Sequence, residues 1–143
     1  MAANYQILCL NMIVKNEGPV IARCLASARP IDYWMIIDTG STDSTQVRIR
    51  TVMADLPGEL HERPWRDLAH NRTEALNLAR PRGDYILIID ADGVLGFEPN
   101  FEIPALEADS YMLRSVDPTP ATPSRRSSGL SCDGDGGAYC MNS

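Results

Sequence analysis

Two carboxylates one residue apart, Asp90 and Asp92, come directly after the apolar run Ile86–Ile89. Where a chain turns after a buried strand, such a pair can hold a divalent cation together with a diphosphate that the cation bridges. A site built only from oxygen ligands suits Mg²⁺ or Mn²⁺. An Asp-x-Asp pair alone is a weak signal, because acidic pairs in loops more often remain solvated or cap a helix. Its interpretation depends on the other polar segments that lie beside it.

A second polar segment, Asp38–Asp43, places a glycine, then Ser, Thr and Asp, ahead of a helical pattern. One interpretation is a helix N-cap, in which these side chains accept hydrogen bonds from free backbone amides. The other is a nucleotide site, in which Asp38 and Thr39 bind a base or ribose and Gly40 lets the backbone approach closely. The residues leave both open. The sequence has no G-x-G-x-x-G fingerprint, which disfavours an ordinary nicotinamide site, and no Walker A lysine loop.

Two further polar clusters, Lys15–Glu17 and His70–Arg72, each come just before or at the start of a predicted helix. The first is either an ordinary exposed loop or part of a site at the end of a strand. In the second, Arg72 can present its fork of donors to a diphosphate, or it is a solvated arginine at a helix start. We interpret His61 and Trp65 as structural, because no partner at a suitable spacing suggests a metal site or a stacking platform.

The elements that position these clusters are four apolar runs rich in β-branched residues, which alternate with three helical patterns. The predicted strands are Gln6–Val14, Tyr33–Asp38, Glu59–Glu62 and Asp84–Asp90, and the predicted helices are Pro19–Ser27, Ser44–Ala54 and Asn71–Arg80. This alternation predicts right-handed crossovers and an α/β fold, a Rossmann-like parallel sheet flanked by helices. In such a sheet ligands bind outside the carboxyl ends of the strands, so the polar clusters are expected to converge there.

The character of the chain changes towards its end. With 143 residues and 44% hydrophobic composition, the chain is long enough for one core. We expect one domain at residues 1–115, with a fifth strand within Ala105–Leu113. Residues 117–137 are dominated by Pro, Ser, Thr, Gly, Asp and Arg, so residues 116–143 are expected to be a low-complexity, disordered tail.

Charge and patterning exclude several classes of partner. The formal net charge is -6, with 19 acidic and 13 basic residues, and no Lys/Arg run is present. We therefore expect no nucleic-acid partner. No apolar run is long enough for a transmembrane segment, and no basic leader precedes one. Cys9 and Cys24 fall inside periodic elements and are expected to be reduced core residues of a cytoplasmic protein.

Taken together and in order, four motifs resemble the family 2 glycosyltransferases. They are Met12–Glu17, Ile37–Asp43, His70–Arg72 and Ile89–Asp92. The resemblance runs from about Gln6 to about Arg114 and is closest to bacterial members whose first motif reads MIVKNE. It covers the N-terminal, donor-binding part of that family.

The resemblance implies a GT-A fold, a nucleoside-diphosphate sugar donor (UDP- or GDP-sugar), Mn²⁺ or Mg²⁺, and transfer to an unknown acceptor with inversion at the anomeric carbon. Asp92 would ligate the metal, while Asp90 would contact the ribose, or the metal through water. The segments Val14–Glu17 and Asp38–Asp43 would enclose the base and ribose. The implied nucleotide-sugar-binding residues are Val14, Lys15, Asn16, Glu17, Asp38, Thr39, Gly40, Ser41, Asp43, Asn71, Arg72 and Asp90, and the implied metal ligands are Asp90 and Asp92.

The sequence departs from the family pattern in three places. Gly93 stands where an acidic residue is common, and Ser44 where glycine is usual. The acceptor-binding region that supplies the catalytic base is not recognisable after Arg114, so no base is assigned. The chain therefore reads as a truncated or frame-shifted donor half, for which donor binding is expected rather than turnover. The alternatives are a non-catalytic nucleotide-binding or interaction module and a nucleotidyltransferase.

Overall fold

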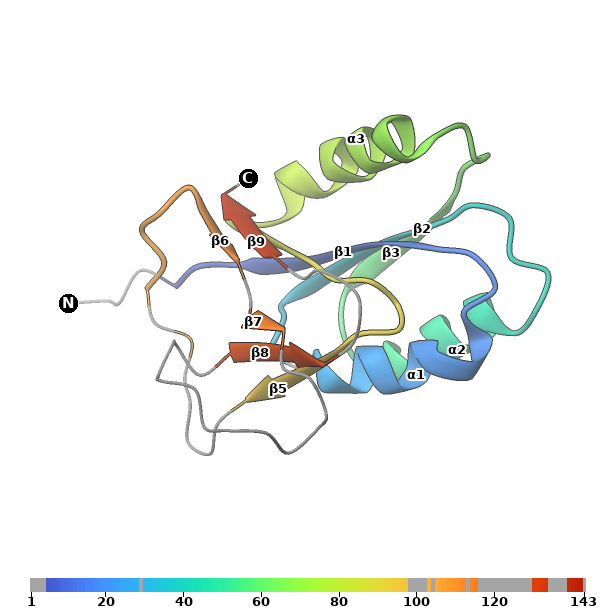
Figure 1. Ribbon diagram of the computed structural model, residues 1–143, viewed down its shortest axis with the longest axis horizontal. Helices are drawn as coiled ribbons and strands as arrows, with labels where there is room; N and C mark the ends of the chain where they lie inside the picture. The colour runs from blue at the N-terminus through green and yellow to red at the C-terminus, as the bar shows by residue number, and fades with distance from the viewer. Residues whose placement is uncertain are drawn as a thin grey trace.

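The main sheet has six strands in the order β3-β2-β1-β4-β9-β6. In this computed structural model, residues 5–28, 30–97, 103, 105–112, 114–115, 130–133 and 139–142 are described. Helices α1 and α2 cover one face of the sheet and α3 covers the other (Figure 1). The predicted α/β class, a parallel sheet flanked by helices, is therefore confirmed.

Four adjacent strands of this sheet are parallel and agree closely with the predicted ones. They are β1 (Leu8–Val14), β2 (Tyr33–Asp38), β3 (Gly58–Glu62) and β4 (Tyr85–Ile88). The helices between them are α1 (Gly18–Ser27), α2 (Thr45–Val52) and α3 (Leu68–Ala79), and the 3-10 helix η1 (Arg80–Arg82) follows α3. Helix α3 begins before the predicted Asn71, because the Asp67 side chain caps it by accepting a hydrogen bond from the His70 amide.

Side chains of the central strands alternate between two hydrophobic cores, one on each face of the sheet. Leu10 and Ile36 pack on the α1 and α2 side, whereas Met35 and Ile86 pack on the α3 side. Cys9 and Cys24 are both buried in the cores, as expected, and burial raises the pKa of the Cys9 thiol to about 12. Both faces of β1, β2 and β4 are thus largely apolar, as is usual for a parallel sheet covered on both sides.

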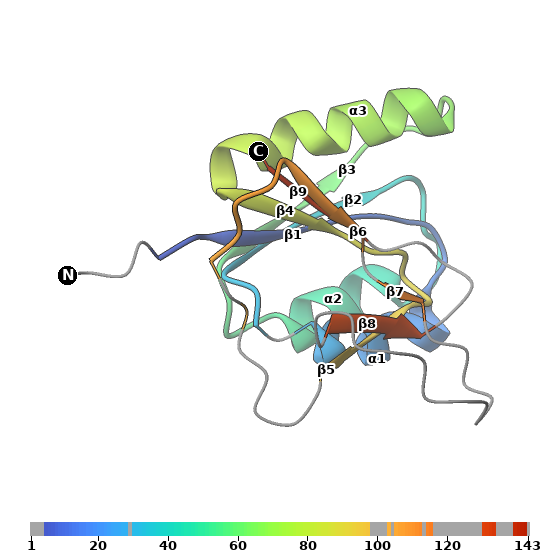
Figure 2. The same cartoon turned by 60° about the vertical axis from the view of Figure 1, so that its left-hand side comes forward.

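The later part of the chain adds further strands, of which the sequence indicated only the one within Ala105–Leu113. Strands β5 (Val94–Phe97), β7 (Arg114–Ser115) and β8 (Leu130–Asp133) form a small second sheet on the same side as α1 (Figure 2). Strands β6 (Ser110–Met112) and β9 (Tyr139–Asn142) extend the main sheet, with β9 antiparallel to β4. The predicted fifth strand within Ala105–Leu113 is confirmed as the shorter β6.

Strands β8 and β9 lie within residues 116–143, the segment expected to be disordered. Their backbones pair with β5 and β4, which are distant in sequence. The composition of this segment does not predict such long-range pairing, because the hydrogen bonds that hold each strand come from a partner strand elsewhere in the chain. The other residues of this segment lie outside the described part of the chain, and the boundary at residue 115 stays a prediction. Within the described segments, no helix combines the length and apolarity needed to cross a bilayer.

We expect Gly58→Ala to destabilise the fold, because Gly58 lies directly against the Trp34 indole. A Cβ built on Gly58 would lie 2.1 Å from Cδ2 of Trp34. The indole is 6% exposed and is held by a 3.0 Å hydrogen bond from its Nε1 to the Leu56 carbonyl oxygen. We expect a loss of about 1–3 kcal/mol in the free energy of unfolding, measured by urea denaturation.

Val47→Ala is the control for this substitution, because Val47 is 67% exposed on α2. It should change the free energy of unfolding by less than about 0.5 kcal/mol. If Gly58→Ala is as stable as the control, the contact between Gly58 and Trp34 does not constrain the fold as described.

Candidate functional site

Parallel strands β1 and β2 end side by side, and hydrogen bonds join the loops that follow them. The Asn16 amide donates to Ser41 Oγ over 2.8 Å, and Asn16 Oδ1 accepts from the Thr42 amide over 2.8 Å. Asn16 has a φ of 52°, a left-handed conformation that asparagine tolerates better than most residues. The Glu17 amide donates to Thr45 Oγ1 over 2.9 Å. The first two predicted clusters therefore form one connected surface, while the Lys15 side chain remains exposed.

Asp43 is exposed at this surface, and its carboxylate joins the two loops. Its carboxylate accepts hydrogen bonds from the Gly18 amide over 3.1 Å and from the Thr45 amide over 3.0 Å. The Thr45 hydroxyl also donates to it. This hydroxyl is the main reason that the pKa of Asp43 lies below its usual value. The Asp43 side chain thus joins the start of α1 to the start of α2, whereas Ser44, the N-cap of α2, makes no side-chain capping hydrogen bond.

Asp38 shapes the turn at the end of β2 and is 1% exposed. Its Oδ1 accepts hydrogen bonds from the Gly40 and Ser41 amides, both at 2.7 Å. Gly40 has a φ of 122°, which a side chain would disfavour. Asp38 Oδ2 is buried and has no hydrogen-bond partner within the described part of the chain. An unsatisfied buried carboxylate oxygen is costly, and it is the kind of group that a ligand N–H donor would satisfy.

Thr39 and Val14 belong to the same edge but are turned towards the protein. The Thr39 amide and hydroxyl donate to the Val14 carbonyl oxygen over 3.0 and 3.2 Å. Both residues are buried, at 6% and 1% exposure. They fix the spacing of the β1 and β2 ends, so any contact of Thr39 with a ligand requires its hydroxyl to accept a hydrogen bond while it donates to Val14.

A cavity of about 310 Å³ opens beside the Asp38 turn. One wall is the predicted segment Asp38–Ser41. The other wall consists of residues that the sequence reasoning missed, from α2 and from the end of β3: Gln46, Glu62, Arg63 and Pro64. The signal for three of them was present, because Glu62, Arg63 and Pro64 come at the carboxyl end of a predicted strand, as the other clusters do.

The acidic pair lies on the turn that follows β4. Ile89 and Ala91 are buried, at 1% and 4% exposure, whereas Asp90 and Asp92 are both exposed. The turn is closed by a 2.9 Å hydrogen bond from the Gly93 amide to the Asp90 carbonyl oxygen. This alternation keeps the two carboxylates available to solvent and to a ligand.

Because β1 pairs in parallel with both β2 and β4, the loops after these three strands lie at one edge of the sheet, and their charges influence one another. The pKa of Glu17, in the loop after β1, is raised first by burial and then by the carboxylates of Asp92, Asp43 and Asp90. Arg72 Nη2 lies 4.0 Å from Asp90 Oδ1 and brings one positive charge to this acidic group. Within the described residues, no three His, Cys, Asp or Glu side chains are close enough to form a complete metal site. A cation here would need ligands from a bound molecule or from water.

Asn71 has a structural role in this edge. It is 0% exposed, and its Nδ2 donates to the Pro64 carbonyl oxygen over 3.1 Å. Its Oδ1 accepts from the Arg66 amide over 2.9 Å. Asn71 therefore holds the loop that forms the Pro64 wall of the cavity. Trp65, on the same loop, is 51% exposed, which does not fit the structural role that we expected for it.

We expect Asn71→Leu to destabilise the protein by about 1–3 kcal/mol, because it leaves the Pro64 carbonyl and the Arg66 amide without partners. Asn77→Leu is the matched control, since Asn77 lies exposed on the same helix. Thermal unfolding of both variants measures the difference. Equal melting temperatures would show that the Asn71 hydrogen bonds do not hold this loop.

Both a protein family and a curated protein match this chain. The model of the family described as "Glycosyl transferase family 2" matches residues 9–102. A TPR repeat-containing protein from Synechococcus elongatus is 35% identical over 91 residues, which are 62% of this chain and 21% of that protein. This chain therefore spans about a fifth of the length of the curated relative that it matches.

Solved structures are similar as well. The mannosyltransferase PcManGT from Pyrobaculum calidifontis, in complex with GDP-Man and Mn²⁺, superposes with a TM-score of 0.52 at 28% identity, covering 64% of this chain and 29% of that one. TarS from S. aureus, in complex with UDP-GlcNAc, gives a TM-score of 0.61 at 14% identity, covering 83% of this chain and 37% of that one. At that identity, TarS supports the fold alone.

Proposed function

This chain belongs to glycosyl transferase family 2 and has the corresponding GT-A fold, and from that premise we propose that it binds a nucleoside-diphosphate sugar at the carboxyl edge of its sheet. It would act as the donor-binding part of a metal-dependent, inverting glycosyltransferase. The observation that carries this proposal is the convergence of three loops, which brings the Asp38 turn and its cavity to the same edge as Asp90 and Asp92.

The cavity beside Asp38 would take the nucleobase. Asp38 Oδ2 is an acceptor without a partner, and uracil and guanine both carry an N–H that can donate to it. Gly40 lets the backbone of the turn lie close to the ligand. Ser41 and Asn16 already bond to each other, so the rim of this site is formed before the ligand arrives.

Asp90 and Asp92 would hold the divalent cation. Their environment fits this role, because the pKa of Glu17 is raised by burial and then by the neighbouring carboxylates, and a cation would relieve the repulsion among them. Mg²⁺ is often held by one or two carboxylates plus substrate phosphates and water, which agrees with the small number of ligands available here. When bound, the metal supplies charge neutralisation for the diphosphate leaving group. The neighbour PcManGT, solved with GDP-Man and Mn²⁺, supports both the donor class and the metal.

Arg72 would orient Asp90 and offset part of the negative charge at the edge. Its guanidinium lies 4.0 Å from the Asp90 carboxylate, and its side chain is only 21% exposed. Because the chain carries a net charge of -6, a doubly charged diphosphate gains little from the overall field. Binding should therefore depend on local cations, among them Arg72, Lys15, the Arg63 that lines the cavity, and the metal.

Sugar transfer with inversion needs one base that removes the proton from the acceptor hydroxyl, in line with the departing phosphate. None of the described residues is assigned that role. The chain's own contribution would be to bind and orient the donor, and a cytoplasmic location is part of this proposal. A non-catalytic nucleotide-binding module is the alternative, and metal-dependent consumption of the donor would distinguish the two.

Thermal denaturation with UDP or GDP, each with and without Mn²⁺, tests the proposal. A ligand that binds only the folded state stabilises it by about 2.7 kcal/mol at a concentration 100 times its Kd. We expect a clear rise in the melting temperature only when nucleotide and metal are both present. The same rise with metal alone would contradict a nucleotide site, because the cation alone would then account for the stabilisation.

A further inference from the structure

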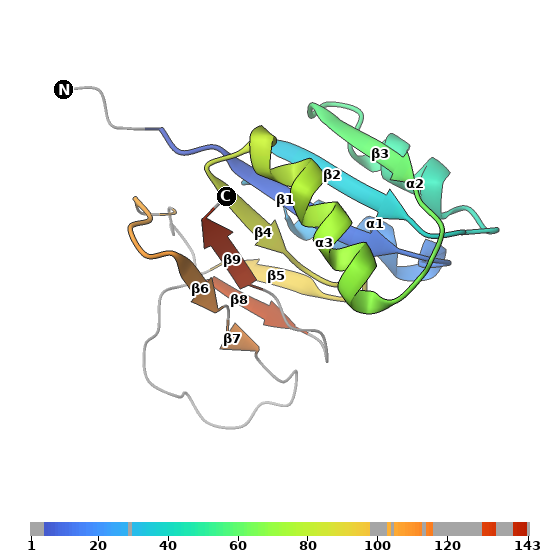
Figure 3. The same cartoon turned by 90° about the horizontal axis from the view of Figure 1, so that it is seen from above.

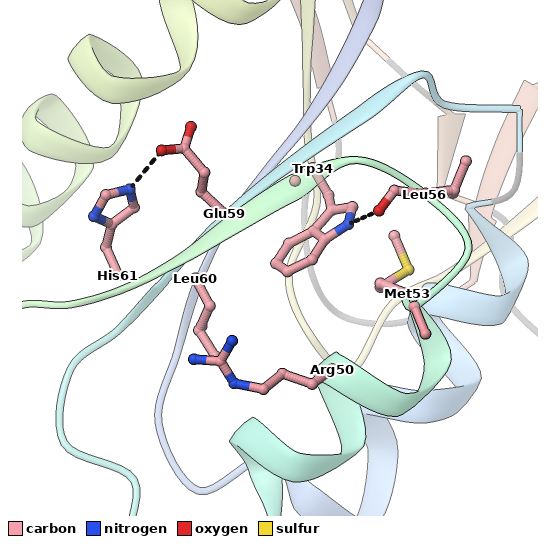
Figure 4. Close-up of a pocket in the computed structure, with 9 residues that line it drawn as sticks. Trp34, Arg50, Met53, Leu56, Glu59, Leu60 and His61 are labelled. Carbon is pink, nitrogen blue, oxygen red and sulfur yellow. Dashed lines mark hydrogen bonds and ion pairs between the residues drawn. The ribbon is translucent and has the colours of Figure 1, made fainter.

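Strand β3 forms one open edge of the main sheet, as seen from above in Figure 3. A second cavity, of about 420 Å³, runs along this edge between β3 and α2. Figure 4 shows the Arg50 side chain reaching from α2 towards Leu60, with the Trp34 indole beside it. Among the described residues, the Arg50 side chain has no hydrogen-bond or ion-pair partner. The edge therefore combines free backbone groups, an apolar groove and an unpaired cation.

The direction of the backbone groups follows from two hydrogen bonds. The Trp34 amide donates to the Pro57 carbonyl oxygen, and the Arg63 amide donates to the Asp38 carbonyl oxygen. Residues 57, 59, 61 and 63 thus turn their N–H and C=O groups towards β2. Since these groups alternate along a strand, those of Gly58, Leu60 and Glu62 point to the open edge. No proline lies within β3 to remove a donor.

We propose that a second copy of this chain pairs with β3 in antiparallel register, centred on Leu60. In this register Leu60 lies opposite Leu60 of the second copy, and Gly58 lies opposite its Glu62. All of these residues have outward backbone groups, so each pair exchanges two hydrogen bonds. The outward backbone groups of residues 58, 60 and 62 allow only registers that place outward residues opposite one another, and the side chains then favour the register centred on Leu60.

Side chains on the α3 face of β3 are complementary in this register. Glu59 lies opposite His61 of the second copy, in a pair without backbone hydrogen bonds, where side chains are closest. Within one chain, His61 Nε2 already lies 3.5 Å from Glu59 Oε1 (Figure 4). A hydrogen bond from the Tyr33 hydroxyl lowers the pKa of Glu59, and Arg82 Nε lies 3.0 Å from its carboxylate. The carboxylate is therefore ionised at neutral pH and can accept a hydrogen bond from either imidazole.

Side chains on the α2 face are complementary as well. Leu60 lines the groove between β3 and α2, so two Leu60 side chains would pack together beside Met53. Glu62 of the second copy lies opposite Gly58, whose α2 face is covered by the Trp34 indole, so the Glu62 carboxylate would lie over that indole.

The Glu62 carboxylate accepts a hydrogen bond from Gln46 Nε2 of its own chain through Oε1 over 2.8 Å, and its other oxygen would reach Arg50 of the second copy. The two-fold symmetry of the pair forms this contact twice. A foreign strand would have to match both charge patterns by chance, which is why we propose a second copy.

Sedimentation equilibrium of the 143-residue chain at about 0.15 M salt, where charge repulsion between copies is screened, tests this interface. We expect a dimer whose Kd rises on the order of tenfold or more in Arg50→Glu, and likewise in Glu62→Arg. The double variant Arg50→Glu/Glu62→Arg exchanges the charges and should restore the Kd to within about threefold of the wild type. Circular dichroism establishes that each variant is folded.

Arg48→Glu is the matched control, because Arg48 lies on the same helix, carries the same charge and is not part of the groove. It should leave the Kd unchanged. A wild-type chain that stays monomeric up to about 100 µM overturns the proposal, since the Kd would then lie above the range of a specific dimer. A dimer that none of the charge reversals weakens, or one that the double variant fails to restore, also overturns it.

Discussion

Asp92→Asn is expected to weaken metal-dependent binding of a nucleoside diphosphate on the order of 100-fold. The Asp92 carboxylate is exposed on the turn after β4, and its proposed role is to ligate the cation. The amide keeps the shape of the side chain but removes its charge. Titration calorimetry of the nucleotide in the presence of Mn²⁺ measures the loss.

Asp92→Asn should weaken binding without destabilising the folded protein. No hydrogen bond to the Asp92 side chain is recorded among the described residues, and its charge repels Glu17. We expect the free energy of unfolding to change by less than about 0.5 kcal/mol. Asp109→Asn, at another exposed carboxylate, should change neither binding nor stability. If Asp92→Asn binds the nucleotide and metal as tightly as the wild type, Asp92 is not the metal ligand.

Asp38→Asn is expected to separate the two roles of the Asp38 carboxylate. The oxygen that accepts from the Gly40 and Ser41 amides is retained as the amide oxygen, so the turn should survive. The buried oxygen without a partner becomes an NH₂ group. This NH₂ group and the N–H of the base are both hydrogen-bond donors, so they could not bond to each other. We expect nucleotide affinity to fall on the order of 100-fold, because a buried donor that loses its acceptor costs about 1–3 kcal/mol.

Asp38→Ala provides the comparison for this variant. It removes both hydrogen bonds of the turn and should destabilise the protein by about 2–4 kcal/mol in urea denaturation, as well as weaken binding. A fully stable Asp38→Asn variant with wild-type nucleotide affinity would contradict the proposed contact with the base. A loss of stability as large as in Asp38→Ala would instead show that the charge itself holds the turn.

The parallel core was predictable because its signals are local. Runs such as Ile86–Ile89 and the alternation of strands with helices specify a sheet covered on both faces, whatever the rest of the chain does. Strands β8 and β9 carry no comparable pattern. They depend on pairing with β5 and β4, and the composition of a segment does not indicate which distant strand it will pair with.

The candidate site was predictable to the level of loops, but not of individual side chains. The rule that ligands bind at the carboxyl edge correctly grouped Asn16, Asp38 and Asp90. It did not reveal that Asn71 is buried and bonded to backbone groups, because an asparagine that faces a ligand and one that holds a loop have the same sequence signature. It also left out Glu62 and Pro64, whose strand end carried no recognised motif.

The most direct test of the central claim is a calorimetric titration of the wild-type chain with UDP and with GDP, each in the presence of Mn²⁺ and of excess chelator. We predict saturable binding of at least one of the two nucleotides with Mn²⁺, and its loss with the chelator. A folded sample that binds neither nucleotide would contradict the account, because the convergent loops would then not form a donor site.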